Sequence, residues 1–297
     1  MVELEKIATE QRNPNTMNID SLSTLEMVRL INQEDHKVAE AVALVTDKIA
    51  LAVDLITDRL SKGGRLIYCG AGTSGRLGIL DAVECPPTYS TDPEMVQSLM
   101  AGGYNAIFKA VEGAEDSKEL GVQDMKNISF SSGDVLVGIA ASGRTPYVLG
   151  CMEYAKELGA ATVAVTCCPG CLLDTIADIG IAPAPGPEVV TGSTRMKSGT
   201  AQKMVLNMLS TGTMIKLGKV YSNLMVDVKP SNEKLIRRCV TIVCTAAECD
   251  EAAAVAALEQ CEYHPKIAIV MVRMGIGAEE AKDLLHQAGG RIAKVLE

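Results

Sequence analysis

The sequence predicts an α/β fold: a three-layer α-β-α parallel sheet of the flavodoxin-like type, followed by a small C-terminal helical domain. Short apolar runs typical of buried strands alternate with helix-length amphipathic segments from residue 24 to about residue 218. Parallel strands need a crossover between them, so this alternation indicates βαβ units with helices on both faces of one sheet. Strand-like runs stop near Pro230, which predicts a sheet domain over 1–230, with an N-terminal helical segment, and a helical bundle over 231–297.

The N-terminal helical segment is predicted from residues 24–61, where apolar side chains recur at steps of three and four. They are Met27, Ile31, Val38, Val42, Val45, Ile49, Val53 and Ile56. This spacing favours an amphipathic helix, or two in succession. Lys62-Gly63-Gly64 then predicts the end of the helix, because glycine commonly follows the last helical turn.

Four apolar runs are predicted to be strands: 65–70, 134–140, 161–167 and 179–185. Helices are expected between and after them. Residues 77–84 form an apolar segment that Pro86-Pro87 should stop.

The remaining helices are predicted from longer segments. Residues 105–125 have a helical pattern that includes the string VEGAEDS, and 194–218 predict a long helix with Met, Val and Leu on a buried face. Residues 233–297 give three short helical patterns, separated by Tyr263-His264-Pro265, Gly275-Ile276-Gly277 and Gly289-Gly290.

Composition excludes several classes of partner. The 37 Asp+Glu outnumber the 28 Lys+Arg and give a net charge of −9, which does not suit binding to a nucleic-acid backbone. No window approaches the roughly 20 apolar residues of a membrane span, and the polar N-terminus lacks the apolar segment of a signal peptide. We therefore expect a cytoplasmic protein with no nucleic-acid and no membrane partner.

Metal binding is not predicted. The ten cysteines are scattered through apolar runs, as small buried side chains with free thiols are. Cys168 and Cys171 form a C-x-x-C pair, but zinc needs about four ligands and the three histidines lie far apart in the sequence. A redox role for this pair stays open.

Two glycine-containing loops repeat one pattern. Gly70…Ser74-Gly75-Arg76 and Gly138…Ser142-Gly143-Arg144 both follow a predicted strand and precede a predicted helix. Backbone N–H groups and serine hydroxyls at the carboxyl ends of parallel strands can hold a phosphate group without much net positive charge. A third polar cluster, Thr191–Arg195, opens the long helix and offers further donors.

These loops are also compatible with two other roles. The first loop matches the G-x-G-x-x-G of a dinucleotide-binding turn, but no acidic residue follows on a second strand, since Asp92 and Glu94 fall in a loop with proline. In a purely structural role the glycines would form tight turns and the serines would cap helices. The repetition, with Ser and Arg in register, favours a compact monophosphate.

Two glutamates are candidates for acid–base chemistry. Glu84 follows the apolar run LGILDAV and precedes Cys-Pro-Pro, and such surroundings are expected to remove water from the carboxyl and raise its pKa. Glu115 lies in VEGAEDS, where surface solvation is the simpler explanation.

Several strings together resemble the N-acetylmuramic acid 6-phosphate etherases of the sugar isomerase (SIS) superfamily. They are TEQRNPNTMNID, GAGTSGRLGILDAVECPPTY, VEGAEDS, IAASGRTPYV and GPEVVTGSTRMKSGTAQKMVLNMLSTG. The resemblance runs from about residue 7 to the end of the chain. It implies a cytoplasmic, cofactor-independent, homodimeric lyase of N-acetylmuramate catabolism and peptidoglycan recycling. Such an enzyme releases D-lactate from N-acetylmuramic acid 6-phosphate and leaves N-acetylglucosamine 6-phosphate.

The resemblance also implies site residues. The catalytic pair of the family falls on Glu84 and Glu115. The residues implied to bind the phosphate and sugar are Gly72, Thr73, Ser74, Gly75, Ala141, Ser142, Gly143, Arg144, Ser193, Thr194 and Arg195. We expect Glu84 to protonate the departing lactate and later activate water, and Glu115 to remove the proton at C2.

Two rival functions remain. An aldose–ketose isomerase of sugar phosphates would use the same phosphate loops and also removes a C2 proton. A non-catalytic phosphosugar-binding regulator would need the loops but not the glutamates. The strings DAVECPPT and VEGAEDS favour the etherase.

Overall fold

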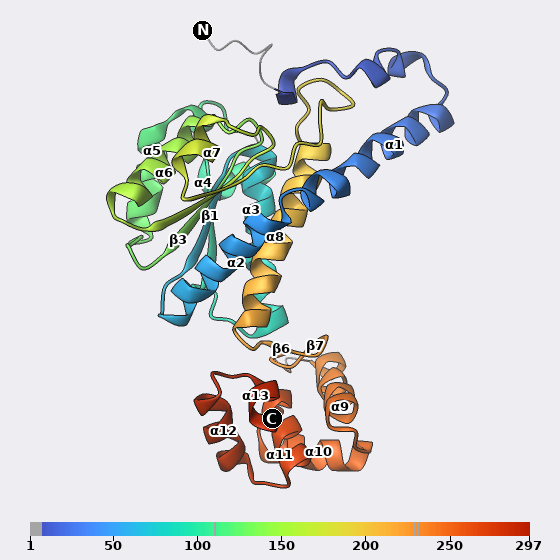
Figure 1. Ribbon diagram of the computed structural model, residues 1–297, viewed down its shortest axis with the longest axis vertical. Helices are drawn as coiled ribbons and strands as arrows, with labels where there is room; N and C mark the ends of the chain where they lie inside the picture. Colours follow the sequence, from blue (N-terminus) through green and yellow to red (C-terminus); the bar gives the residue numbers. More distant parts are fainter. Residues whose placement is uncertain (1–7, 110, 229, 231) are drawn as a thin grey trace. The chain divides into compact units, whose positions relative to one another are not determined.

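A computed structural model describes residues 8–109, 111–228, 230 and 232–297 (Figure 1). The chain forms two compact units, each assembled from two segments. The first takes in the chain up to Ala82 together with Glu94–Ser210, and the second takes in Val83–Pro93 together with Thr211–Glu297. The domain boundary predicted near Pro230 stays a prediction.

The first unit contains one parallel sheet. Its strands are β1 (Leu66–Gly70), β2 (Val96–Met100), β3 (Val135–Ile139), β4 (Ala161–Val165) and β5 (Ile179–Ile181), in the order β2-β1-β3-β4-β5. Helices cover both faces in Figure 1. On one side lie α5 (Lys118–Asn127), α6 (Pro146–Glu157) and α7 (Leu172–Ile176), and on the other lie α2 (Thr46–Ser61), α3 (Gly72–Tyr89) and α8 (Lys197–Lys216). The predicted fold class is confirmed.

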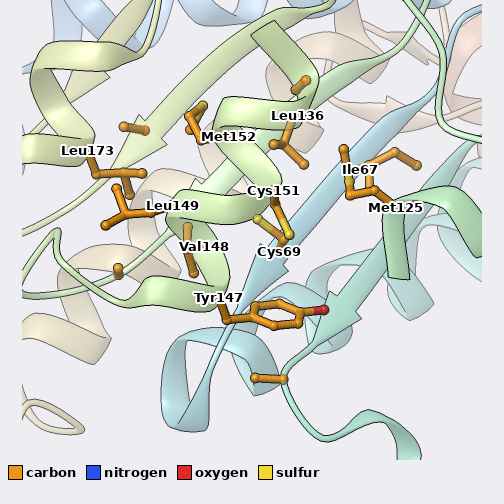
Figure 2. Close-up of a cluster of buried hydrophobic side chains, with 14 of the residues drawn as sticks. Ile67, Cys69, Met125, Leu136, Tyr147, Val148, Leu149, Cys151, Met152 and Leu173 are labelled. Atoms are coloured by element: carbon orange, nitrogen blue, oxygen red, sulfur yellow. The ribbon is translucent and has the colours of Figure 1, made fainter. Parts of the chain in front are cut away.

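All residues of β1, β3 and β4 are buried, which explains why these strands consist of nearly uninterrupted apolar residues. One face of the sheet packs on α5 and α6 (Figure 2), where Met125, Tyr147 and Met152 meet Ile67 and Leu136. This core holds the ends of β1 and β3 in fixed register.

Strand β2 was not predicted. Its sequence is Val-Gln-Ser-Leu-Met, and only its first and last residues are buried. Because β2 forms the edge of the sheet, Gln97 and Ser98 are tolerated there, and the segment lacks the apolar run that identified the central strands.

Residues 24–61 form two helices in succession, which is one of the two predicted alternatives. They are α1 (Thr24–Ala43) and α2 (Thr46–Ser61). Ser23 and Glu26 form a reciprocal capping box at the start of α1. After α2 the chain turns at Gly63, whose φ of +87° favours glycine.

Helix α3 (Gly72–Tyr89) contradicts the expectation that Pro86-Pro87 would stop it, because both prolines lie inside it. Proline has no N–H, so neither residue can bond the carbonyl four positions earlier, on Ala82 or Val83. Cys85 and Tyr89 are buried on either side of the prolines, and this packing stabilises the helix past them. The two compact units divide at these same two carbonyls, between Ala82 and Val83.

The predicted helix over 105–125 is also wrong as a single element. The structure has α4 (Gly103–Phe108), a 3-10 turn (Ala114–Asp116) and α5 in its place. Gly113 has a φ of +74° and interrupts the helical conformation. VEGAEDS therefore lies in a loop.

The long helix is present as α8 (Lys197–Lys216), and its buried face includes Val205, Leu206, Leu209 and Met214. Over the part of the chain that the structure describes, no helix is long and apolar enough to cross a membrane.

The second unit has a hairpin of β6 (Val220–Tyr221) and β7 (Leu224–Met225), and five helices in its described residues. The helices are α9 (Glu233–Ala247), α10 (Glu251–Gln260), α11 (Pro265–Met274), α12 (Ala278–Gln287) and α13 (Ile292–Leu296). The three predicted separators are correct. The sequence pattern missed two features. One is the break after α9, where Glu248 has a φ of +55° and Asp250 caps α10. The other is the short final helix α13.

Candidate active site

The strand order places the predicted phosphate loops at one point of the sheet. From β1 the chain crosses to β2 at one edge, and from β3 it continues to β4 on the other side. A crevice opens where the direction of winding reverses, at the carboxyl ends of the two strands. Gly70 and Ile139, the last residues of β1 and β3, are direct partners in the sheet, so the loops that follow begin side by side.

The first loop is almost entirely helical. Gly72, with a φ of +53°, begins α3, so Thr73, Ser74 and Gly75 form its first turn instead of the predicted loop. The free N–H groups of a helix N-terminus favour an anion. Gly75 has to be glycine, because a Cβ would lie 2.8 Å from the carbonyl oxygen of Gly70.

Two side chains of the first loop are used within the fold. Ser74 is buried, and its hydroxyl donates to Oε1 of Gln202 on α8 at 2.9 Å. Arg76 donates from its guanidinium to the carbonyls of Ala106 and Ile107, each at 2.8 Å. These bonds hold the end of α4 against α3, so Arg76 has a structural task.

The second loop stays outside its helix. Gly143 N–H donates to the Ala140 carbonyl at 3.0 Å, and α6 begins only at Pro146. Gly143 has a φ of +66°, and a Cβ there would overlap Sγ of Cys171. Ser142 is half-buried and Arg144 exposed, and within the described residues neither side chain makes a hydrogen bond or ion pair.

The third predicted cluster precedes α8 in a series of turns. Ser193, Thr194 and Arg195 lie there, half-buried or exposed. The first N–H groups of α8 are already occupied, since Glu188, fully buried, accepts from the backbone of Lys197 and Ser198 at 2.9 Å each. An anion at this cluster would therefore depend on side chains and turn N–H groups rather than on the helix terminus.

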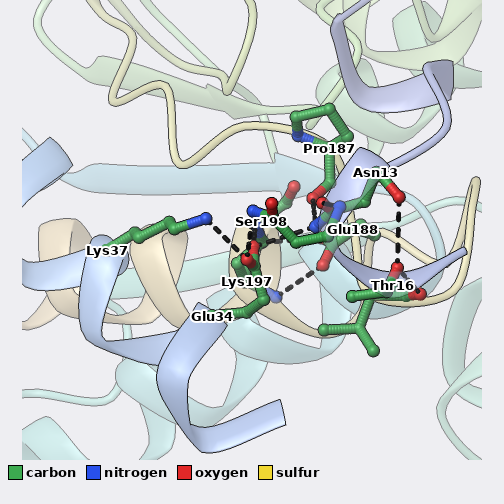
Figure 3. Close-up of polar contacts among 10 residues, drawn as sticks. Asn13, Thr16, Glu34, Lys37, Pro187, Glu188, Lys197 and Ser198 are labelled. Atoms are coloured by element: carbon green, nitrogen blue, oxygen red, sulfur yellow. Dashed lines mark hydrogen bonds and ion pairs between the residues drawn. The ribbon is translucent and has the colours of Figure 1, made fainter. Parts of the chain in front are cut away.

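A buried ion pair anchors the start of α8 (Figure 3). Nζ of Lys197 donates to Glu34 of α1 at 2.7 Å, and both side chains are nearly inaccessible. Burial by itself would raise the pKa of Glu34, but hydrogen bonds outweigh it and lower the pKa to about 2. The donors are Lys197, Lys37, Asn15 and Asn13. No local sequence pattern indicates this network, because its two main partners are 163 residues apart.

A second unpredicted carboxylate lies on α3. Asp81 accepts from Tyr68 of β1 at 2.7 Å and from Asn207 and Ser210 of α8 at 2.8 and 3.0 Å. Burial raises the pKa of Asp81, which these hydrogen bonds oppose. Asp81 thus fixes α3 between the sheet and α8.

Glu115 shares a cavity with the first phosphate loop. The cavity measures about 240 Å³ and is lined by Ala71, Gly72, Arg76, Met100, Ala101, Ala106, Val111, Glu112, Gly113 and Glu115. Two carboxylates, of Glu112 and Glu115, and the N-terminus of α3 therefore line one space, large enough for part of a small ligand.

Glu84 differs from the expectation for it. It lies on the segment of α3 that belongs to the second unit, and its side chain is exposed. The nearest large apolar residues before it, Leu80 and Val83, are themselves exposed, at 49% and 58%. The burial that was expected for Glu84 is absent in this chain.

The cysteines show no metal or disulfide site. All ten are free, and the described residues contain no group of three or more His, Cys, Asp or Glu placed to hold a metal ion. Cys168 and Cys171 are buried, and burial raises the pKa of the Cys171 thiol, which disfavours the reactive thiolate.

Comparison with protein families and curated proteins gives full-length relatives. The N-terminal SIS domain of glucokinase regulatory protein matches residues 48–156, and the SIS domain matches 114–212. N-acetylmuramic acid 6-phosphate etherase of Photorhabdus laumondii is 58% identical over 98% of this chain and 97% of its own length. Those of Klebsiella aerogenes and Clostridium botulinum are 56% and 54% identical, over 99% and 100% of this chain and 98% of their own lengths.

Solved structures agree on the fold. A putative phosphosugar isomerase from Bacteroides fragilis has a TM-score of 0.52 at 21% identity, covering 68% of this chain and 95% of its own. Phosphoheptose isomerase from Neisseria gonorrhoeae has a TM-score of 0.50 at 18% identity, covering 64% and 98%. At these identities the likeness establishes the sheet and its helices alone.

Proposed function

The chain belongs to the N-acetylmuramic acid 6-phosphate etherase family, and from this premise we propose how its residues carry out the reaction. It is a carbon–oxygen lyase that cleaves the lactyl ether of N-acetylmuramic acid 6-phosphate. The observation that carries the proposal is the cavity shared by Gly72 and Glu115 at the switch point of the sheet. It offers donors for an anion and a carboxylate for proton transfer in one place.

The phosphate group binds between the two loops that follow β1 and β3. The N–H groups of Thr73 and Ser74 at the start of α3 supply the first set of donors, whereas the Gly75 N–H already donates to the Ala71 carbonyl at 3.2 Å. Ser142, whose hydroxyl has no partner among the described residues, supplies a further donor from the second loop. Ser193, Thr194 and Arg195 are the third contributors in this proposal.

The reaction proceeds by elimination and then hydration. In the open-chain sugar the C1 aldehyde acidifies the C2 proton, which Glu115 removes as a general base. Glu84 protonates the ether oxygen as the C3–O bond breaks, so D-lactate leaves with its oxygen and a C2–C3 double bond remains. Water then adds at C3, with Glu84 taking its proton and C2 regaining one, which gives N-acetylglucosamine 6-phosphate.

A homodimer, a cytoplasmic location and independence from cofactors complete the proposal. Support for the dimer comes from large apolar side chains on α1 and α2 that are exposed in the single chain: Leu25, Val28 and Leu51 at 59%, 53% and 54%. Light scattering at micromolar concentration should give twice the chain mass.

The roles of the glutamates can be separated by substitution. Glu84→Gln should lower D-lactate release by roughly 10²–10⁴-fold, the usual span for losing a general acid, while C2 exchange into D₂O continues. Glu115→Gln should stop both. Asp116→Asn is the matched control, because Asp116 is exposed in the same 3-10 turn but does not line the cavity.

Isotopes test the order of bond breaking. Product formed in D₂O should carry deuterium at C2, and product formed in H₂¹⁸O should carry the label at the C3 hydroxyl of the sugar. Label in lactate would contradict elimination and hydration whatever the glutamates do. Exchange lost in Glu84→Gln but kept in Glu115→Gln would reverse the two roles.

A further inference from the structure

The second unit contains a cavity that shares no lining residue with the cavity of Gly72 and Glu115. It measures about 740 Å³, within the range of small-molecule sites. All of its lining residues belong to the second unit, whereas the cavity with Gly72 and Glu115 belongs to the first. Its walls are mainly apolar and include Pro86, Pro87, Pro93, Val226, Val228, Leu235, Pro265, Ile267 and Leu285.

Positive charge is concentrated in this apolar cavity. Lys219, Lys266 and Lys282 line it, and Asp227 is the one carboxylate among its described lining residues. Asp227 accepts from Lys266 at 2.6 Å and pairs with Lys219 at 3.2 Å. One carboxylate shared by two ammonium groups leaves one positive charge to be balanced.

The most buried of these lysines is Lys266, and its burial disfavours the charged form. The side chain of Lys266 is 13% exposed, and burial lowers its pKa, which Asp227 opposes. A buried charge is stable when it is fully paired, so a ligand anion beside Lys266 would be favoured. Lys282 lies at the exposed side, paired with Glu279 at 2.7 Å.

A polar group without a partner adds a second observation. Thr91 is 7% exposed and lines the cavity, and its hydroxyl has no hydrogen bond within the described residues. A buried hydroxyl without a partner is unfavourable, because it has lost its water and gained nothing in return. A ligand oxygen in the cavity would satisfy it.

We propose that this cavity, the lysine cavity, binds a small organic anion, a carboxylate or phosphate ester with an apolar body. The lysines and Thr91 hold the acidic group, and the proline, valine and leucine side chains hold the body. An amino-sugar phosphate does not fit this description, because its surface is polar throughout. The ligand would contact α3 at Pro86 and Pro87, within one turn of Glu84.

The test uses 8-anilinonaphthalene-1-sulfonate, an anion with an aromatic body, and the full-length protein. Titration should show saturable binding of one probe per chain, with a Kd of about 10–100 µM. Benzoate should displace the probe and benzyl alcohol of similar size should not. Saturating N-acetylglucosamine 6-phosphate should leave the probe bound.

Variants locate the site. Lys266→Met and Lys282→Met should each weaken probe binding by about tenfold or more, while Lys294→Met, an exposed change on α13, should have no effect. If Lys266→Met does not fold, Lys282→Met and the benzoate comparison decide the question. Absence of saturable binding, equal displacement by benzyl alcohol, displacement by the sugar phosphate, or equal loss in Lys294→Met would each overturn the proposal.

Discussion

The two loops that share the pattern Ser-Gly-Arg have different tasks in the structure. In the first, Ser74 bonds α8 and Arg76 bonds the end of α4, so both polar side chains support the fold. In the second, Ser142 and Arg144 make no such bonds within the described residues. A repeated motif therefore indicates a repeated position in the fold, at the end of a strand, but not a repeated task for each side chain.

The difference follows from where each helix begins. Helix α3 starts at Gly72, so Ser74 and Arg76 project from a helical turn that packs against other elements. Helix α6 starts at Pro146, two residues after Arg144, so the second motif remains a turn. We infer that the second loop is the one whose side chains are available to a ligand.

Replacing the glycine with a positive φ in each loop, Gly72 in the first and Gly143 in the second, should give the largest difference in stability. Gly143→Ala should lower the free energy of unfolding by about 3 kcal/mol, because a Cβ would overlap Cys171 Sγ and φ is positive. Gly72→Ala also has a positive φ but no atom within 4 Å of its Cβ, and should cost about 1 kcal/mol. Denaturant unfolding measures both, and equal losses would contradict a role for packing against Cys171.

Replacing the arginines should give the second-largest difference in stability between the loops. Arg76→Met removes two hydrogen bonds to carbonyls and should cost about 2 kcal/mol of stability. Arg144→Met, at an exposed side chain, should change stability by less than about 0.5 kcal/mol. Thermal unfolding of the pair provides the comparison. A larger loss at Arg144 would mean that its contacts lie outside the single chain.

The serines should show opposite effects on stability and binding. Ser74→Ala leaves the buried Gln202 amide without its partner and should cost about 1 kcal/mol of stability. Ser142→Ala should leave unfolding unchanged and raise KM for the phosphosugar about tenfold, equivalent to about 1.4 kcal/mol. An unchanged KM in folded Ser142→Ala protein would remove this serine from the phosphate site.

Acid should act on the α8 terminus, and α8 supports the first loop through Gln202. The pKa of Glu34 is lowered to about 2 in the folded protein, so its stabilising contribution is complete above pH 4.5 and declines as pH falls toward 2. Denaturation midpoints measured from pH 6 to pH 3 should fall less steeply in Glu34→Gln than in the unchanged protein. Identical slopes would show that another carboxyl controls the acid response.

The sequence predicted the sheet, and the ends of β1 and β3 from which the two loops start, for a physical reason. Central strands are buried on both faces and must be apolar, so their runs stand out, and their carboxyl ends meet at one edge. The edge strand β2 lacks that constraint. Gln97 and Ser98 interrupt its apolar pattern, so the strand was not predicted. Local patterns also cannot reveal pairings over long sequence separations, such as Glu34 with Lys197.

The prolines of α3 show another limit of predicting helix ends from sequence. A sequence rule based on backbone hydrogen bonds predicts a stop at Pro86, but burial of Cys85 and Tyr89 outweighs the bonds that are lost. Glu84 was expected in buried surroundings because apolar residues precede it, but Leu80, one helical turn earlier on the same face, is itself exposed.

The two absent hydrogen bonds in α3 have a mechanical consequence. An unbroken α-helix resists bending along its whole length, since each turn is linked to the next. In α3 the carbonyls of Ala82 and Val83 lack that link, so we expect the helix to bend most easily at this point. Glu84 is the first acidic residue beyond it. The helix therefore consists of two stiff segments joined at a more flexible point, and the predicted acid lies beside that point.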